Sequence, residues 1–178
     1  MKERILIREI KDTDFDSECQ MGNMEDYKVR RASRGVLIHE GKIALLNVTK
    51  HNFHKLPGGG IDGNETVQEA FKRELLEEAG CNCEILDEGG IIIEWRDQFK
   101  ILQINYVFLA KVVGDPKESK LMEDEIEDGF ILEWVLPGKI EGVLKKDNPA
   151  NYEGQFITTR DKAIIEFYKD YLNRLIPG

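Results

Sequence analysis

Three glutamates, Glu74, Glu77 and Glu78, are the residues of this chain best suited to chemistry. They lie in residues 59–81, where a glycine-rich turn leads into a short predicted helix. Side chains three and four residues apart are neighbours on a helix, and crowded carboxylates repel one another unless a positive charge neutralises them. Mg²⁺ prefers oxygen ligands, keeps several waters and shares its remaining positions with substrate phosphates. The spacing therefore predicts a site for a hard divalent cation.

Local signals define the helix that would carry these glutamates. Thr66 and Glu69 have the spacing of a capping box, which satisfies amide groups at a helix start. Gly80 can adopt the left-handed conformation that ends many helices. Arg73 can pair with Glu69 or with Glu77, four residues away in either direction. We expect Arg73 to hold an acidic side chain in place as well as to support the helix.

The alternative for these glutamates is an acidic helix face that only meets solvent. At about 100° per residue, the helix has one apolar stripe, and Glu74 and Glu78 fall on or beside it. Carboxylates that only meet solvent should lie on the helix face opposite the apolar stripe, so the pattern favours a metal site. The stripe consists of Val67, Ala70, Phe71, Leu75 and Ala79.

The same segment resembles the signature of the Nudix hydrolases, GX5EX7REUXEEXGU, in which U is a bulky aliphatic residue. Only Cys81 departs from the signature, at the final U. Buried cysteine behaves as a small hydrophobe, so we expect softer packing there and unchanged chemistry. The positions that match are Gly59, Glu65, Arg73, Glu74, Leu75, Glu77, Glu78 and Gly80.

The resemblance implies hydrolysis of a diphosphate bond in a nucleoside diphosphate joined to another group, with Mg²⁺ or Mn²⁺ as cofactor. It makes the three helix glutamates metal ligands and gives the metal a backbone carbonyl from Gly59. Arg73 joins the glutamates in the predicted catalytic set. The chemistry is consistent in itself, because a metal lowers the pKa of bound water and phosphoryl transfer needs mainly positioning and charge neutralisation.

Residues outside the motif are further candidates. Nudix enzymes often draw another glutamate, as metal ligand or general base, from a region that corresponds to the acidic segment 117–129 of this chain. Glu123 and Glu125 are both candidates, and the sequence gives little ground for choosing between them. A solvated acidic loop is the alternative for both.

Four residues are predicted to contact the substrate. His54 precedes the glycine turn, and Arg34 precedes an apolar strand. Trp95 and Arg96 end another strand, where an aromatic ring and a guanidinium could grip a base or a phosphate. The structural alternatives are a surface loop position for His54, a solvated basic cluster for Arg34, and ordinary packing at a strand end for Trp95 and Arg96.

Apolar and polar patterning predicts the elements around the motif. Strands are expected at 35–39, 42–48, 83–95, 100–113 and 131–135, with a tight turn at Glu40 and Gly41 and a bulge or break at Gly89 and Gly90. Residues 49–57 are expected to form a loop, and helices are expected at about 137–145 and at 157–174. Together with the resemblance, this order predicts an α/β fold of the α+β type, a Nudix-like α/β/α sandwich with a mixed β-sheet between helices.

We expect residues 1–30 to form an N-terminal extension and residues 31–178 the Nudix domain. The extension mixes a strand-like start with polar sequence. Such a segment often builds a dimer contact or covers a substrate pocket. A homodimer is therefore one expectation for the partners of this chain.

Composition narrows the class of partner. The 178 residues carry a formal net charge of -9, which disfavours binding to a nucleic-acid polymer because such affinity comes largely from basic side chains. No apolar run approaches the ~20 residues that span a membrane, and the start lacks the apolar core of a signal peptide. Three cysteines with no structural-zinc spacing fit a reducing compartment. We expect a cytoplasmic protein with a small nucleotide substrate and no membrane contact.

Three functions remain open at this stage. The favoured one is a metal-dependent pyrophosphohydrolase. The second is a non-catalytic Nudix-like module that binds nucleotides for regulation, although such modules usually lose motif glutamates. The third is a prenyl diphosphate isomerase, which would need its own cysteine and glutamate elsewhere. Two residues downstream of the signature distinguish Nudix subtypes, a proline in ADP-ribose hydrolases and a tyrosine in dinucleoside polyphosphate hydrolases. Neither is found around Asp97 to Phe99. A nucleoside triphosphate, ADP-ribose and a nucleotide sugar therefore all stay open as substrates.

Overall fold

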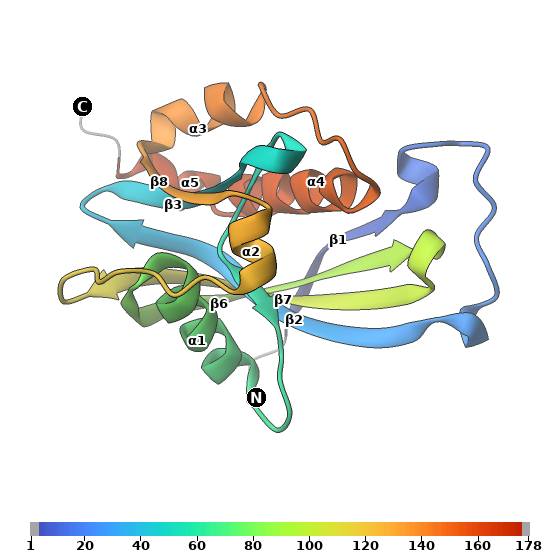
Figure 1. Ribbon diagram of the computed structural model, residues 1–178, viewed down its shortest axis with the longest axis horizontal. Helices are drawn as coiled ribbons and strands as arrows, with labels where there is room; N and C mark the ends of the chain where they lie inside the picture. The colour runs from blue at the N-terminus through green and yellow to red at the C-terminus, as the bar shows by residue number, and fades with distance from the viewer. Residues whose placement is uncertain (1–3, 176–178) are drawn as a thin grey trace.

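A mixed β-sheet runs between two layers of helices (Figure 1). The computed structural model of the protein describes residues 4–175, and eight strands of this part form the sheet. Their path is β1-β6-β7-β2-β3-β4, with β5 paired to β2 and β8 paired to β3. The strands are β1 (Ile5–Lys11), β2 (Lys28–His39), β3 (Lys42–Val48), β4 (Phe53–Lys55), β5 (Gly58–Gly60), β6 (Asn82–Arg96), β7 (Ile101–Val113) and β8 (Phe130–Val135).

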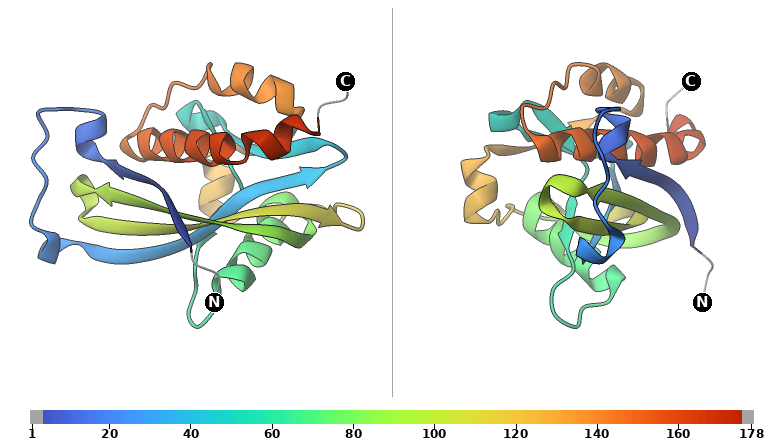
Figure 2. Two further views of the ribbon diagram at one scale, coloured as in Figure 1. Left: turned by 180° about the vertical axis from the view of Figure 1, so that it is seen from behind. Right: turned by 90° about the vertical axis from the view of Figure 1, so that its right-hand side faces the viewer.

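The helices divide between the two faces of the sheet. Helix α1 (Val67–Ala79) lies on one face, while α3 (Pro137–Leu144), α4 (Tyr152–Phe167) and α5 (Lys169–Asn173) lie on the other (Figure 2). The short α2 (Glu123–Glu127) precedes β8. This arrangement confirms the predicted α/β/α sandwich. No helix in residues 4–175 is long and apolar enough to cross a membrane.

The sheet contains two parallel pairs of neighbouring strands, and its other pairs are antiparallel. Strands β6 and β7 form a long antiparallel hairpin, β1 runs parallel to β6, and β2 runs parallel to β7. Strands β2 and β3 meet in the predicted tight turn, where Glu40 and Gly41 have φ of 48° and 73°, as a two-residue hairpin loop requires. The predicted bulge is also present, because the β6–β7 register shifts between Glu88 and Gly90.

Helix α1 forms as its local signals predict. The Thr66 hydroxyl accepts a hydrogen bond from the Glu69 amide at 3.2 Å, and the Glu69 carboxylate accepts one from the Thr66 amide at 2.8 Å. Gly80 ends the helix at φ 65°. Because Glu69 serves the cap, Arg73 pairs with Glu77 at 3.0 Å, which is the other partner that the spacing allows.

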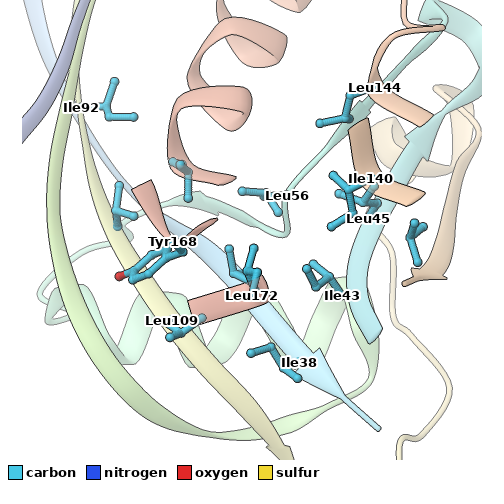
Figure 3. Close-up of a cluster of buried hydrophobic side chains, with 14 of the residues drawn as sticks. Ile38, Ile43, Leu45, Leu56, Ile92, Leu109, Ile140, Leu144, Tyr168 and Leu172 are labelled. Carbon is cyan, nitrogen blue, oxygen red and sulfur yellow. The ribbon is translucent and has the colours of Figure 1, made fainter. Parts of the chain in front are cut away.

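Two apolar cores lie on the two faces of the sheet. Helix α1 packs through Phe71, which stacks on Phe108 of β7 with ring centroids 4.9 Å apart. The larger core lies under α3, α4 and α5 (Figure 3). Fully buried Ile10 belongs to it, so β1 contributes to the main core. The predicted division between residues 30 and 31 falls inside β2 and stays a prediction.

Three segments differ from the sequence-based expectation. The final helix begins at Tyr152 instead of residue 157, because the Asn151 side chain caps it by accepting a hydrogen bond from the Gly154 amide at 2.9 Å. It also ends at Phe167, since Tyr168 leaves helical geometry before α5 begins. The expected loop at 49–57 contains β4, which pairs with β3, and the acidic segment contains α2.

Candidate active site

Glu78 lies on the inner side of α1 beneath the glycine turn. Its carboxylate accepts hydrogen bonds from the Lys55 ammonium and from the Gly58 amide, both at 2.6 Å. The residue is 1% exposed. A buried charge needs partners of this kind, because an unpaired charge is costly to remove from water. Strands β4 and β5 therefore hold Glu78 in one position.

Glu74, one turn earlier on α1, lies against the backbone of Gly59. A Cβ atom added at Gly59 would come within 2.5 Å of the Glu74 carboxylate, so glycine is needed for this close approach. Burial raises the pKa of Glu74 to about 7, and the charge of Glu78 adds to this effect. The two carboxylates are thus close enough to disfavour ionisation together, and a cation would relieve both.

Arg73 connects the motif glutamates to the glycine turn. Its guanidinium donates to Glu65 at 2.8 Å, to Glu74 at 2.8 Å and to the carbonyl of Gly60 at 2.9 Å, in addition to Glu77. The hydrogen bond with Glu65 is the largest of the contributions that raise the pKa of Arg73. These contacts give Arg73 the geometry of a positioning residue.

A pocket with a volume of about 330 Å³ opens beside Glu78, within the size range of small-molecule sites. Five predicted residues line it, namely Gly59, Glu78, Arg34, Arg96 and Glu125. Glu74 lies behind Gly59, and Glu77 meets Arg73 with its side chain 32% exposed. The remaining lining residues are Arg30, Val48, His51, Phe53, Lys55, Gly58, Gln103, Asp124, Asp128, Phe130, Asn151, Glu153, Ile157 and Arg160.

The structure separates the two acidic candidates of α2. Glu125 faces the pocket, and burial raises its pKa, with the negative charge of Glu78 acting in the same direction. Glu123 is exposed at the start of α2 and is not among the lining residues. Glu125 is therefore the member of the pair that can act with Glu78.

Trp95 and His54 are not among the residues that line this pocket. The Trp95 indole donates to Glu9 of β1 at 2.6 Å, since successive side chains of a strand face opposite sides of the sheet and Arg96 takes the pocket side. The His54 ring lies 2.7 Å from the Asp147 carboxylate, whereas its neighbours Phe53 and Lys55 line the pocket. Both residues have structural partners, and their contact with a substrate stays a prediction.

Sequence reasoning missed two cations of the pocket, Lys55 and Arg160. Lys55 lies only three residues before Gly58, and nothing local distinguished it from an exposed loop lysine. Arg160 left a weak signal, because it stands four residues before Ile164 on the apolar stripe of the final helix. A charged residue on such a stripe is buried only when it is paired.

The donor chemistry of the site suits a hard cation. Carboxylate and backbone oxygens are the ligands that Mg²⁺ prefers. Within residues 4–175, however, no group of three or more His, Cys, Asp or Glu side chains is arranged to hold a metal ion. Lys55 and Arg73 instead supply positive charge to Glu78 and Glu74. The carboxylates of Glu74 and Glu78 and the backbone of Gly59 nevertheless offer the kind of oxygen donor that such an ion takes.

Comparison with known proteins agrees with this geometry. Residues 29–155 match the NUDIX domain family. The chain belongs to the Nudix family.

Relatives of the chain carry the names of nucleotide hydrolases. An RNA pyrophosphohydrolase from Bartonella henselae is 27% identical in an alignment of length 165 that covers 82% of this chain and 87% of that protein. An oxidized purine nucleoside triphosphate hydrolase from Mus musculus is 30% identical over 95 residues, 51% of this chain and 61% of that protein. A Bacillus subtilis relative is 34% identical over 105 residues, and the match spans 59% of this chain and 64% of the relative.

Solved structures show the same fold at low sequence identity. A NUDIX hydrolase from Nitrosomonas europaea has a TM-score of 0.60 at 18% identity, over 81% of this chain and 90% of that one. The MutT protein from Methanosarcina mazei Go1 has a TM-score of 0.54 at 20% identity, over 82% and 97% of the two chains. These likenesses confirm the predicted fold class.

Proposed function

We propose that this chain is a metal-dependent pyrophosphohydrolase that cleaves a diphosphate bond in a nucleoside diphosphate-linked compound. The observation that carries the proposal is the burial of Glu74 and Glu78 beneath the glycine turn, with Glu78 at the wall of a pocket that also contains arginines. Relatives named RNA pyrophosphohydrolase and oxidized purine nucleoside triphosphate hydrolase support the reaction class. A nucleoside triphosphate, including an oxidised one, ADP-ribose and a nucleotide sugar all stay candidate substrates.

The residues that would hold Mg²⁺ or Mn²⁺ are Glu74, Glu77 and Glu78, the carbonyl of Gly59, and Glu125 from α2. When bound, the metal neutralises phosphate charge and lowers the pKa of a water molecule. Gly58 and Gly59 keep the backbone close to the glutamates, as the clash of a Cβ atom at Gly59 indicates.

The other residues of the pocket orient the substrate. Arg34 and Arg96 offer guanidinium groups that match phosphate oxygens. Glu125, whose raised pKa follows from burial, is placed to accept a proton near Glu78. Lys55 lines the same pocket as Glu78, so its ammonium group can pair with a substrate phosphate.

The second candidate is a nucleotide-binding module without activity. All motif glutamates are present, and Glu78 keeps its buried position on the pocket wall, which favours catalysis. Cytoplasmic location and a homodimer stay predictions from the sequence.

A nucleotide panel tests the proposal. The chain should release phosphate-containing products with millimolar Mg²⁺ or lower Mn²⁺, and products identified by mass show the substrate and the bond that breaks. Activity on the best substrate should vanish in excess EDTA and fall about a hundredfold or more in Glu78→Gln. Glu84→Gln, on an exposed part of β6, is the matched control and should keep full activity. Turnover that persists in EDTA would overturn the proposal.

A further inference from the structure

Three buried arginines lie together in one part of the pocket. Arg34 of β2, Arg96 of β6 and Arg160 of α4 are 5%, 3% and 1% exposed, and all three line the pocket. We name them the arginine cluster. Their positions come from three elements that are distant in sequence, so the fold as a whole assembles this group.

One carboxylate organises the arginine cluster. Glu94, which is fully buried, accepts hydrogen bonds from Arg96 at 2.6 Å and from Arg160 at 3.2 Å. The Asn105 amide also donates to Glu94 at 3.1 Å, and its oxygen accepts from Arg34 at 2.9 Å. The guanidinium groups are therefore held in fixed orientations by partners behind them.

The arginine cluster contains more guanidinium groups than buried carboxylates. Two buried carboxylates, Glu94 and Asp161, face three guanidinium groups. Glu153 pairs with Arg96 at the rim, where its side chain is 46% exposed and where solvent weakens the interaction. Burial lowers the pKa of Arg34 to about 9, and the positive charge of Arg160 adds to the shift. An additional anion would stabilise this part of the pocket.

Two polar atoms in the same wall have no partner among the described residues. Arg160 Nη2 is a buried donor and Gln103 Oε1 a buried acceptor, and neither makes a hydrogen bond. Both residues line the pocket. Leaving such groups unsatisfied costs free energy, so a ligand that accepts from Arg160 and donates to Gln103 would complete the wall.

We propose that the arginine cluster, with Gln103, binds a phosphate group of the substrate other than those held at the glutamates. A hydrogen phosphate group supplies both the anionic oxygen for Arg160 and the hydroxyl for Gln103, whereas a fully ionised oxyanion supplies only the first. The inference rests on the proposed function, because both groups belong to one pocket. This inference narrows the candidate substrates to compounds that carry a further phosphate group outside the diphosphate bond that is cleaved.

Inorganic phosphate in the presence of EDTA is the probe, because it requires neither metal nor turnover. In the ¹⁵N-labelled protein, the guanidinium Nε–H signals of Arg34 and Arg160 should shift saturably as phosphate is added. The Arg174 signal should stay in place, since that residue is exposed at the end of α5. Loss of one signal in Arg160→Lys assigns the Arg160 resonance. Sulfate, which has the charge but no hydroxyl at neutral pH, should bind more weakly.

Variants measure the contribution of Arg160. Arg160→Gln should weaken phosphate binding about tenfold or more, since hydrogen bonds to charged groups are the stronger kind. Arg174→Gln should bind like the unmodified chain. If Arg160→Gln does not fold, Arg160→Lys keeps a charge beside Glu94 while it loses the planar donor pair, and it should raise KM more than it lowers kcat.

The outcomes separate the two proposals. Equal shifts at Arg174 and Arg160, or no saturable shift at all, would overturn the phosphate subsite even if hydrolysis is found. Saturable binding that Arg160→Gln leaves unchanged would overturn it as well. Phosphate binding without hydrolysis of any nucleotide would instead remove the proposed function and leave the subsite standing.

Discussion

Lys55 donates a hydrogen bond from its ammonium group to the Glu78 carboxylate at 2.6 Å, so a cation of the chain itself occupies the inner side of the proposed metal site. The Lys55 ammonium also lies 4.8 Å from the ring centre of Phe130. The ion pair is held on both sides, by the Gly58 amide at Glu78 and by the Phe130 ring at Lys55. A metal ion at Glu78 must therefore compete with Lys55.

This competition can be measured with Lys55→Gln. Without metal, the variant should have a lower Tm, because breaking a buried pair leaves Glu78 uncompensated, a change that typically costs about 3–5 kcal/mol. Added Mg²⁺ should then raise the Tm more than it does in the unmodified chain. Lys50→Gln is the control, since Lys50 is exposed. An equal Mg²⁺ effect in Lys55→Gln and the unmodified chain would show that Lys55 does not compete with the ion.

Glu125 and Glu123 form a matched pair on α2. Glu125→Gln should lower turnover by about a hundredfold, because general acid–base groups typically contribute 10²–10⁴-fold and Glu125 faces the pocket. Glu123→Gln should change turnover little, since Glu123 is exposed and outside the lining. Steady-state rates at saturating Mg²⁺ compare the two. A larger loss in Glu123→Gln would reverse the assignment.

Local signals predicted the part of the site that is local in sequence. Thr66, Glu69 and Gly80 define α1 within one segment, and the glycine turn lies directly before it. A capping box and a left-handed glycine act over a few residues, so one sequence contains all the necessary information. The positions of Glu74 and Glu78 on the apolar stripe followed from helical periodicity alone.

Long-range contacts were beyond the reach of such signals. Arg160 meets Glu94 across 66 residues, and neither residue carries a motif. Trp95 and Arg96 are adjacent, but only one can face the pocket, because alternation reverses the side at each residue. Which of the two faces the pocket depends on the register of β6 against β7, and the sequence pattern does not determine that register. Helix α4 likewise begins earlier than its periodic pattern predicts, because the Asn151 side chain caps it.

His54 should make stability depend on pH. Burial alone would lower its pKa, but the hydrogen bond to Asp147 and the charges of Asp147 and Glu133 raise it above the ordinary value. Its contribution to stability is therefore complete below the unfolded pKa of about 6.5 and is lost as pH rises through the folded pKa. The free energy of unfolding of the unmodified chain minus that of His54→Gln should shrink from pH 5.5 to 8.5.

Urea unfolding across this range measures the difference. Asp147→Asn is a second variant that should remove the same pH dependence, because it removes the main partner of the charged ring. A difference that stays constant with pH would mean that the His54 charge does not contribute to stability.

Strand β1 should contribute to folding as part of the main core, although the sequence suggested an extension. Ile10 is fully buried against the core, whereas Ile5 on the same strand is 60% exposed. Ile10→Ala should therefore lower the free energy of unfolding by about 2–5 kcal/mol. Ile5→Ala, which removes the same atoms from a solvent-facing position, should stay within about 0.5 kcal/mol. Urea unfolding gives both values. Two equal and small losses would show that residues 5–11 do not belong to the folded core, and only then should a chain that begins at Val29 be as stable as the full one.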